Sequence, residues 1–415
     1  MDGLDGTWDD TSGTVSITAA SHCDFVNFNN ECYITNGTDV PFKYTGAAAA
    51  TNIAQDLVDI GLTKAKYLEE FNNYLFFGNV EVSSTTYQTR IYWSGLKDTT
   101  SWSALDFIEI GLNDGQEITG IKKLSDRLVI FKTRSIYNLF FTGDSDIPFI
   151  LKRSNSSVGC IAPWSIQELE NGLVFLSYDG LYFYDGNNSF KVSDKVNTTI
   201  KGFNQSRFSS AVSLVQKDKN RYMLATTSSG ATSNNRVLVW DYFNKAFSIY
   251  VGINAADMAT FYIGGTDERP YFGDYSGYTY RADTGSDDYP LNAVTAIDAY
   301  YVTNWKFYKD IVNIKQVPHV YMYYAINNAV LTLSYSFEFE TGDQYSQTFS
   351  TATSSDVYGT GLYGTATYSS AGNGIKRRDL MGSGRVIRFK IANSVAGETF
   401  TIHGIGQHAN LETNK

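Results

Sequence analysis

Residues 165–186 read SIQELENGLVFLSYDGLYFYDG, and this stretch decides the fold class. Its first residues, Ser165–Leu169, have the composition of a strand, and the apolar run Leu173–Ser177 is typical of a buried strand. Asp179-Gly180 then favours a two-residue hairpin turn with positive φ angles, after which Leu181–Tyr184 returns as a third strand. Three strands joined by tight turns therefore fit within this one stretch.

The same plan recurs on both sides of this unit. Similar strand-like runs are Ile118–Ile121, Arg127–Phe131, Ser135–Phe140, Arg221–Ala225, Arg236–Asp241 and Ala246–Tyr250. Strands begin anew, 45 to 52 residues apart, near His22, Tyr67, Thr119, Ile166, Ala211 and Asp257. Such a period is typical of a four-stranded propeller blade of ~40–50 residues. We therefore expect an all-β chain in which residues 1–288 form a β-propeller of about six blades, with short helical connectors at 52–62 and 194–203.

The pattern of strand lengths changes after Asp288. Longer strands are expected at Ala299–Trp305, Val320–Tyr324, Val330–Phe339, Arg385–Ile391 and Thr399–Ile405. Between them, residues 341–374 are rich in Ser, Thr, Gly and Tyr and are expected to form a long loop or hairpin arm. Residues 289–415 are therefore predicted to be a second β domain, of the β-sandwich type.

Composition and charge exclude several classes of protein. A chain of 415 residues exceeds the ~250–300 residues that one hydrophobic core can serve, so more than one domain is expected. No apolar run approaches the ~20 residues of a membrane helix, so no membrane insertion is expected. The first 65 residues hold nine Asp and Glu against Lys43 and Lys64 within a net charge of −10, which disfavours a sequence-specific DNA-binding protein. The first residues have neither the basic start nor the apolar stretch of a secretory signal, so folding in a cytoplasm is expected.

No motif in the sequence predicts catalysis. Neither the histidines nor the cysteines have metal-ligand spacing, so we expect no metal or other cofactor. The histidines are His22, His319, His403 and His408. The cysteines, Cys23, Cys32 and Cys160, are expected to be buried and reduced. A Gly-x-Ser-x-Gly elbow, a Walker loop and a dinucleotide fingerprint are all missing from the sequence. The prediction is a protein that is not an enzyme, with no catalytic residues.

A glycosidase is the enzymatic alternative, because two carboxylates ~5–9.5 Å apart suffice for glycoside hydrolysis. Candidate acids are Asp106, Glu109, Asp179, Asp241 and Asp257. However, Asp179 and Asp241 stand at predicted turns, where Asp is favoured because its carboxylate bonds to the backbone. A structural role is therefore favoured over catalysis for these acids.

One segment concentrates positive charge. It comprises Lys376, Arg377, Arg378, Arg385, Arg388 and Lys390. Arginines at this density suit bidentate contacts with carboxylates or phosphates. We predict an interface here, with charge-complementary packing against neighbouring subunits or between the two domains; a solvated strand face is the alternative.

Several runs of the chain resemble the propeller of bacteriophage tail proteins. They are Ile91–Ser94, Asn113–Gly120, Leu128–Tyr137, Ser157–Ile166 and Val174–Tyr182. The similar proteins are the tail hub, nozzle or packaged-DNA-stabilisation components of short-tailed phages, and the resemblance covers roughly residues 22–250. The chain begins closer to its first blade than this resemblance implies, so the first blade is expected to be incomplete or closed by another segment.

The resemblance implies a structural role in a virion tail. It implies a homo-oligomeric ring, usually a hexamer, below the portal and adaptor, assembled in the host cytoplasm. Its channel conducts the genome with transient, non-specific DNA contact and retains the packaged genome until ejection. Acidic walls suit such a channel because they repel phosphates over about 8 Å at physiological salt. The alternatives are a carbohydrate-binding receptor-recognition protein, with Tyr358–Tyr368 as a stacking surface, and the glycosidase propeller.

Overall fold

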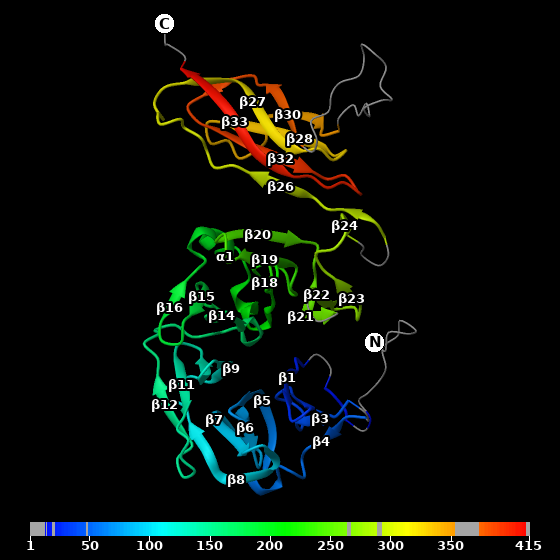
Figure 1. Ribbon diagram of the computed structural model, residues 1–415. Helices are drawn as coiled ribbons and strands as arrows, with labels where there is room; N and C mark the ends of the chain where they lie inside the picture. Colours follow the sequence, from blue (N-terminus) through cyan, green and yellow to red (C-terminus); the bar gives the residue numbers. More distant parts are fainter. Residues whose placement is uncertain are drawn as a thin grey trace. The chain divides into compact units, whose positions relative to one another are not determined.

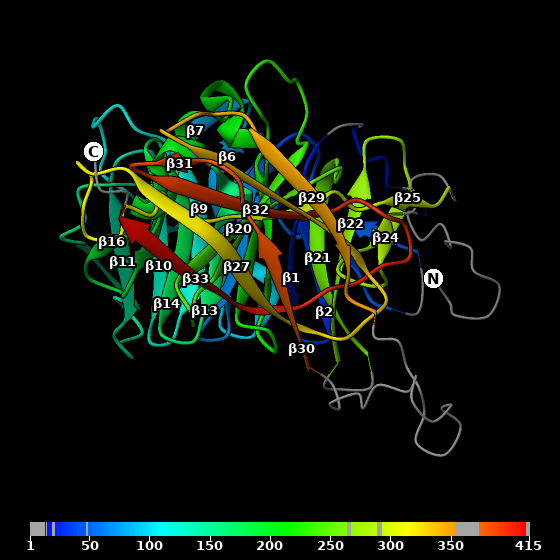
Figure 2. The ribbon, with the colours of Figure 1, turned by 90° about the horizontal axis from the view of Figure 1, so that it is seen from above.

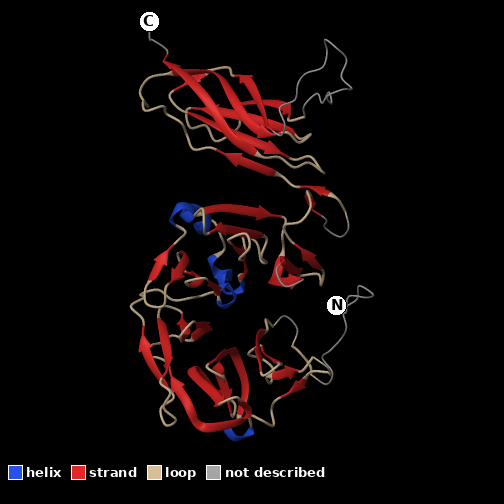
Figure 3. Ribbon diagram, in the orientation of Figure 1, coloured by secondary structure: helices blue, strands red, loops and turns tan. Residues whose placement is uncertain are grey.

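The computed structural model describes residues 13, 15–18, 21–46, 49–263, 267–288, 293–352 and 373–411. These residues form strands with only short helical segments, so the predicted all-β class is confirmed (Figure 3). The chain divides into two compact units, Met1–Asp283 and Thr284–Lys415. The division falls five residues before the boundary expected after residue 288.

The first unit contains six antiparallel sheets, and each sheet is made of strands that follow one another in the chain. The first sheet consists of β1 (Asp24–Phe28), β2 (Glu31–Thr35), β3 (Phe42–Tyr44) and β4 (Thr51–Asn52). The second consists of β5 (Leu62–Phe71), β6 (Tyr74–Val82), β7 (Thr85–Gly95) and β8 (Asp98–Glu109). The third consists of β9 (Ile118–Leu124), β10 (Arg127–Lys132), β11 (Ile136–Phe141) and β12 (Phe149–Arg153).

The remaining three sheets continue the series. The fourth consists of β13 (Gln167–Leu169), β14 (Gly172–Ser177), β15 (Gly180–Tyr184) and β16 (Ser189–Lys191). The fifth consists of β17 (Val212–Gln216), β18 (Arg221–Thr226), β19 (Arg236–Asp241) and β20 (Ala246–Val251). The sixth has three described strands, β21 (Ala255–Ile263), β22 (Asp267–Asp274) and β23 (Thr279–Arg281).

The six sheets are the blades of a β-propeller, which confirms the predicted architecture. In Figure 1 they succeed one another around a common centre, in colours from blue to yellow-green. Neighbouring blades meet at their first strands, which are β1, β5, β9, β13, β17 and β21. Each of these strands contacts the first strand of a neighbouring blade, as β17 does with β21. Among the described residues, the first blade has four strands of its own and the sixth has three, so the expectation that the first blade is incomplete or closed by another segment was wrong.

The core of the propeller is a series of seams between blades. Apolar clusters join the first blade to the second, and so on as far as the sixth; their central residues include Phe77, Phe149, Phe175, Trp240 and Met258. At the seam between the third and fourth blades, the rings of Phe131 and Phe175 lie 5.1 Å apart. Because the blades bury both faces against their neighbours, their second strands, such as β10 and β14, read as nearly continuous apolar runs.

Hydrogen bonds from side chains of the inner strands to backbone carbonyls cross these seams. Thr119 Oγ1 donates to Cys160 O (2.7 Å), and Thr260 Oγ1 donates to Val215 O (2.7 Å). Gln167 Nε2 donates to the carbonyl of Ser213 in the next blade (2.9 Å). Each bond satisfies a carbonyl outside the ladder, so the blades are fixed in register as well as packed.

The hairpin turns have clear local causes. Asn29-Asn30 and Asn72-Asn73 all have φ between 50° and 64°, the left-handed region that asparagine tolerates. The turn after β14 departs from prediction: its loop residues are Tyr178-Asp179, neither has positive φ, and only Gly180 does (155°). The hairpin itself is present as expected.

The helical segments are short connectors, as predicted for 52–62 and 194–203. Their bounds are η1 (Val58–Ile60), η2 (Pro163–Ser165), η3 (Asp194–Val196), α1 (Asn197–Lys201) and η4 (Gln205–Ser210). Within the described ranges, no helix has the length and apolar character needed to cross a membrane.

The second unit is a β-sandwich, as predicted. One sheet has the order β26 (Ala299–Val302), β32 (Ile387–Asn393), β28 (Val330–Phe337) and β29 (Tyr345–Ser350). In the other, β27 (Lys315–Ala325) pairs with β30 (Asn373–Asp379), β31 (Ser383–Gly384) and β33 (Ile402–Leu411), and β27 and β33 run side by side in Figure 2. A short pair, β24 (Asp287–Asp288) and β25 (Thr295–Ala296), precedes them. The two sheets enclose one apolar core, to which Met322, Leu333 and Phe389 belong.

The expected arm at 341–374 is only partly described. β29 occupies its first part and β30 begins at its end, while residues 353–372, including the Tyr358–Tyr368 stretch, lie outside the described residues.

Candidate functional site: the polar centre of the propeller

Charged side chains from four blades meet on the inner strands of the propeller. Asp24 lies on β1, Glu69 on β5, Lys122 on β9 and Glu168 on β13. Lys122 Nζ lies 3.3 Å from Glu69 Oε2, and the Leu68 N–H donates to Asp24 Oδ2 (3.1 Å). None of these four residues stands out in the sequence, because each is an ordinary strand residue until the blades close.

Burial and charge shift the pKa values in this cluster. Burial raises the pKa of Asp24 from its ordinary 3.8 to about 6, against the opposing effects of Lys122 and the Leu68 N–H. The Glu69 carboxylate, and then Asp24, raise the pKa of Lys122 and keep it charged, although burial opposes this. Three carboxyl groups around one lysine thus leave the centre acidic at neutral pH.

The pKa of Asp24 predicts a pH dependence of stability. A carboxyl whose pKa is higher in the folded chain than in the unfolded one binds more protons when folded between about pH 4 and pH 6. The free energy of unfolding therefore falls as the pH rises through that window. The shift corresponds to a destabilisation of about 3 kcal/mol, which is absent below pH 4 and fully present above pH 6.

We expect Asp24→Asn to remove this contribution and to raise the free energy of unfolding at pH 8 more than at pH 4. Urea denaturation at both pH values measures it. Asp126→Asn is the control, since Asp126 is exposed and Arg127 lowers its pKa. An Asp24→Asn variant that is less stable than the wild type at pH 8 would contradict the prediction.

A second group of side chains includes His22 and Cys23, which directly precede β1, and Asp257 on β21. The ring of His22 lies 5.4 Å from that of Trp164, which in turn lies 6.2 Å from Tyr67. Burial raises the pKa of Asp257 on β21, while His22 lowers it. The charge of Asp257 also acts on Cys23, just before β1, whose pKa burial raises further. Asp257 of the sixth blade therefore interacts electrostatically with His22 and Cys23, which directly precede β1.

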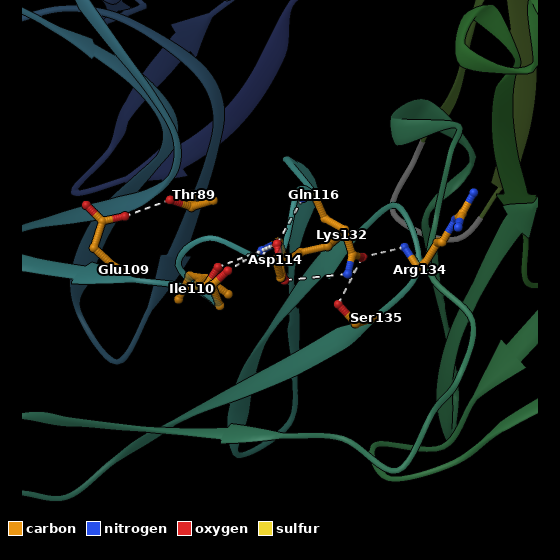
Figure 4. A network of polar contacts seen from close by, with 9 residues as sticks. Thr89, Glu109, Ile110, Asp114, Gln116, Lys132, Arg134 and Ser135 are labelled. Atoms are coloured by element: carbon orange, nitrogen blue, oxygen red, sulfur yellow. Dashed lines mark hydrogen bonds and ion pairs between the residues drawn. The ribbon is translucent and has the colours of Figure 1, made fainter.

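The third blade carries a buried lysine, shown in Figure 4. Lys132 is fully buried, and its Nζ lies 2.6 Å from Asp114 Oδ2 and donates to the carbonyls of Ile110 (2.7 Å) and Gly111 (3.2 Å). These partners belong to the loop between the second and third blades. Gln116, at the end of that loop, accepts from Arg134 N (2.8 Å). Lys132 therefore links the third blade to the loop between the second and third blades, which is a structural role.

The predicted candidate acids are placed mostly in structural contacts. Asp179 pairs with Lys191 (2.9 Å), Glu109 accepts from Arg90 Nε (2.7 Å), and Asp241 accepts from Asn244 N (2.8 Å), the turn role that was expected. Burial raises the pKa of Asp106. In the described part of the chain, no three His, Cys, Asp or Glu side chains are grouped to hold a metal ion. The expectation of buried thiols holds for Cys160, while Cys23 and Cys32 are only half-buried.

The predicted cationic segment does not form one patch. Lys376, Arg377 and Arg378 lie on β30, where alternation places Arg377 on the outer face and its two neighbours on the other face. Arg377 pairs with Asp379 (2.9 Å), and Arg378 donates to Thr348 O (3.0 Å) above the ring of Phe349. These three residues are thus part of a strand, as in the alternative of a strand face, and the predicted interface stays a prediction.

Arg385 and Arg388 lie elsewhere, at one end of the sandwich, and Lys390 on β32 pairs with Asp343 (3.1 Å). Arg385 Nε donates to Val312 O (3.2 Å), and Arg388 Nη2 donates to Glu340 O (3.1 Å) and lies over the ring of Trp305. Arg385 and Arg388 thus contact the exposed loops that contain Val312 and Glu340.

Comparisons with known proteins reveal no family. No protein-family model matches the chain, and no curated protein matches it. Similar solved structures include Hsv2 of Kluyveromyces lactis (6% identity, TM-score 0.36, 63% of this chain and 74% of that one). Others are the extracellular domain of the hybrid two-component system BT4673 of B. thetaiotaomicron (12%, 0.39, 68% and 36%) and PorZ of Porphyromonas gingivalis (13%, 0.37, 68% and 34%). The match spans about a third of the latter two chains. These similarities are too weak to assign a function.

Proposed function

We propose that this chain is a structural subunit of a bacteriophage tail, of the nozzle or hub kind. Copies assemble as a ring, expected to be a hexamer, below the portal and adaptor. The ring forms part of the DNA channel and retains the packaged genome until ejection. No catalytic step is part of this role.

The observation that carries the proposal is that the residues resembling tail propellers are the same residues that form the complete blades. The resemblance to tail propellers covers roughly residues 22–250, and the five complete four-stranded blades span Asp24 to Val251. The residues that carry it are strand and turn residues of these blades, such as Leu128–Phe131 on β10 and Val174–Ser177 on β14. A resemblance carried by packing residues fits a protein whose task is to hold its shape.

The charge distribution supports a channel through which DNA passes without adhering. Residues 1–283 hold 32 Asp and Glu against 23 Lys and Arg, a net charge of −9. Surfaces of this sign repel phosphates and leave non-specific DNA binding weak.

The assembly state tests the proposal. We expect the purified chain, at micromolar concentration, to give a mass of several copies by native mass spectrometry and a ring with a central channel in negative-stain images. A well-folded chain that stays monomeric at every concentration tested would overturn the ring. A DNA-retention assay with tails that lack this protein would then separate the tail role from ring formation.

Receptor recognition through glycans is the second candidate, because one face of the sandwich offers a suitable surface. On the outer face of the β27 sheet, Tyr323 is 42% exposed and stands opposite Gly404 on β33, above which nothing lies within 4 Å. Tyr321 stands opposite Gly406 on one side and Arg377 on the other. Aromatic rings beside glycines and hydrogen-bonding side chains are a surface on which sugars stack. Binding on a glycan array that Tyr323→Ala abolishes would favour this candidate.

A further inference from the structure

One end of the sandwich exposes five large apolar side chains on three loops. We call it the apolar end: Phe307 (50% exposed), Ile311 (53%), Val312 (74%), Phe339 (54%) and Met381 (73%). The loops precede β27, join β28 to β29 and precede β32. Soluble proteins rarely leave such a patch uncovered, and its usual meaning is an interaction surface.

Specific contacts hold these loops together, so the apolar end is a built surface. Arg385 N and Nη1 reach Glu338 Oε1 (2.7 and 3.6 Å), while Arg385 Nε donates to Val312 O. The rings of Trp305 and Phe339 lie 5.2 Å apart. Lys315, which is buried, donates to Asn313 O (2.8 Å) and Arg385 O (3.0 Å).

Two turns at this end carry residues that the turns themselves disfavour. Tyr308-Lys309 have φ of 49° and 66°, and Glu338-Phe339 have φ of 55° and 63°. Each turn is closed by one backbone bond, from Asp310 N to Phe307 O and from Glu340 N to Phe337 O. Such turns favour Asn and Gly, and this chain uses Asn-Asn for similar turns in the propeller. Bulky residues in this conformation are strained, which indicates a role beyond the turn. Tyr308 packs against the sandwich core, whereas the Phe339 side chain is 54% exposed.

Charge indicates what covers the apolar end. Residues 305–315, 337–340 and 380–388 together hold five Lys and Arg against three Asp and Glu, a net charge of +2. Residues 1–283, which form the propeller unit, carry −9. Aromatic residues, Met and Arg are the residues enriched in protein–protein interfaces, and steering by opposite charge favours association.

We propose that the apolar end binds the propeller unit of a second copy of this chain. This inference rests on the proposed ring and names the surface that builds it. Each copy contributes its sandwich end to one neighbour and its acidic propeller to the other, a heterologous contact of the kind that closes rings.

The sharpest test is Phe339→Gly, because it separates assembly from folding. Glycine relieves the positive φ of residue 339, which offsets the loss of the ring contact with Trp305, so we expect a Tm close to that of the wild type together with at least a tenfold weaker association. Sedimentation velocity over a concentration series measures the association, and differential scanning calorimetry the Tm.

Two valines provide a matched pair. Val312→Ser at the apolar end should weaken association, while Val395→Ser, beyond the other end of β32 and 44% exposed, should leave it unchanged. Equal association of Phe339→Gly, Val312→Ser and wild type would overturn the inference while the ring of the proposed function stands. A wild type that is itself monomeric would instead overturn the ring.

Cross-linking of a mixture of ¹⁴N- and ¹⁵N-labelled chains identifies the occupant. Lys306 and Lys309, in the first loop, should cross-link to lysines of residues 1–283 with mixed isotope labels. Pairs of uniform label alone would show that the apolar end covers the propeller of its own chain, and mixed pairs between two apolar ends would show a symmetric dimer; either result overturns the inference.

Discussion

Lys132→Met is expected to lower the free energy of unfolding of the propeller unit by about 3–5 kcal/mol. Methionine keeps the length of the side chain but removes the ammonium. Asp114 then remains as a carboxylate without its cation, and the carbonyls of Ile110 and Gly111 lose their donor (Figure 4). The cost arises because the carbonyls of Ile110 and Gly111 lose their donor beside a buried side chain, while the Asp114 carboxylate, whose side chain is 25% exposed, loses its cation.

Urea denaturation followed by tryptophan fluorescence measures this effect, since five of the six tryptophans lie in residues 1–283. Lys123→Met is the matched control. Its ammonium lies 2.7 Å from Glu70 Oε2 but is 44% exposed, so its loss should cost at most about 1 kcal/mol. Adding Asp114→Asn to Lys132→Met should restore part of the stability. If Lys132→Met lowers the free energy of unfolding no more than Lys123→Met does, the contacts of Lys132 with Asp114 and the loop carbonyls do not stabilise the propeller.

Phe131→Ala should lower the free energy of unfolding by a similar amount, about 3–5 kcal/mol. Phe131 is fully buried, and its ring packs on Phe175 (5.1 Å) and Tyr184 (6.4 Å) of the next blade. Truncation therefore opens a cavity in a seam between two blades, where neither sheet can collapse to fill it. Phe190→Ala, on the outer strand β16 and 53% exposed, is the control and should cost less than about 1 kcal/mol.

A double-mutant cycle extends this test to the architecture. Phe131→Ala and Phe175→Ala remove the same seam, so their effects should deviate from additivity by about 0.5–3 kcal/mol. Phe131→Ala and Phe77→Ala act at different seams and should add within about 0.5 kcal/mol, because Phe77 packs on Trp102 in the cluster of the first two blades. Additive behaviour of the Phe131 and Phe175 pair would contradict a core made of seams.

The roles of some of these residues can be predicted from the sequence, whereas the roles of others cannot. The place of Phe131 in a buried strand follows from the apolar run Leu128–Phe131, whose alternation and flanking turns are local. The start of each blade was placed within five residues of the observed strand, because turns and strand length are set by neighbouring residues. The division of Lys376–Arg378 between two faces also follows from strand alternation, once β30 is known to be a strand.

The sequence by itself determined the all-β class, the six repeats, the second sandwich unit and the acidic balance of the propeller. All of these arise from periodicity, turn residues and composition, which act over a few residues or sum over many. Only the tertiary structure decided that Lys132 meets Asp114, that Asp24, Glu69, Lys122 and Glu168 share one centre, and that three distant loops form the apolar end. The physical reason is that charge burial and side-chain contact depend on which strands close against one another, and closure joins residues tens of positions apart that leave no local pattern.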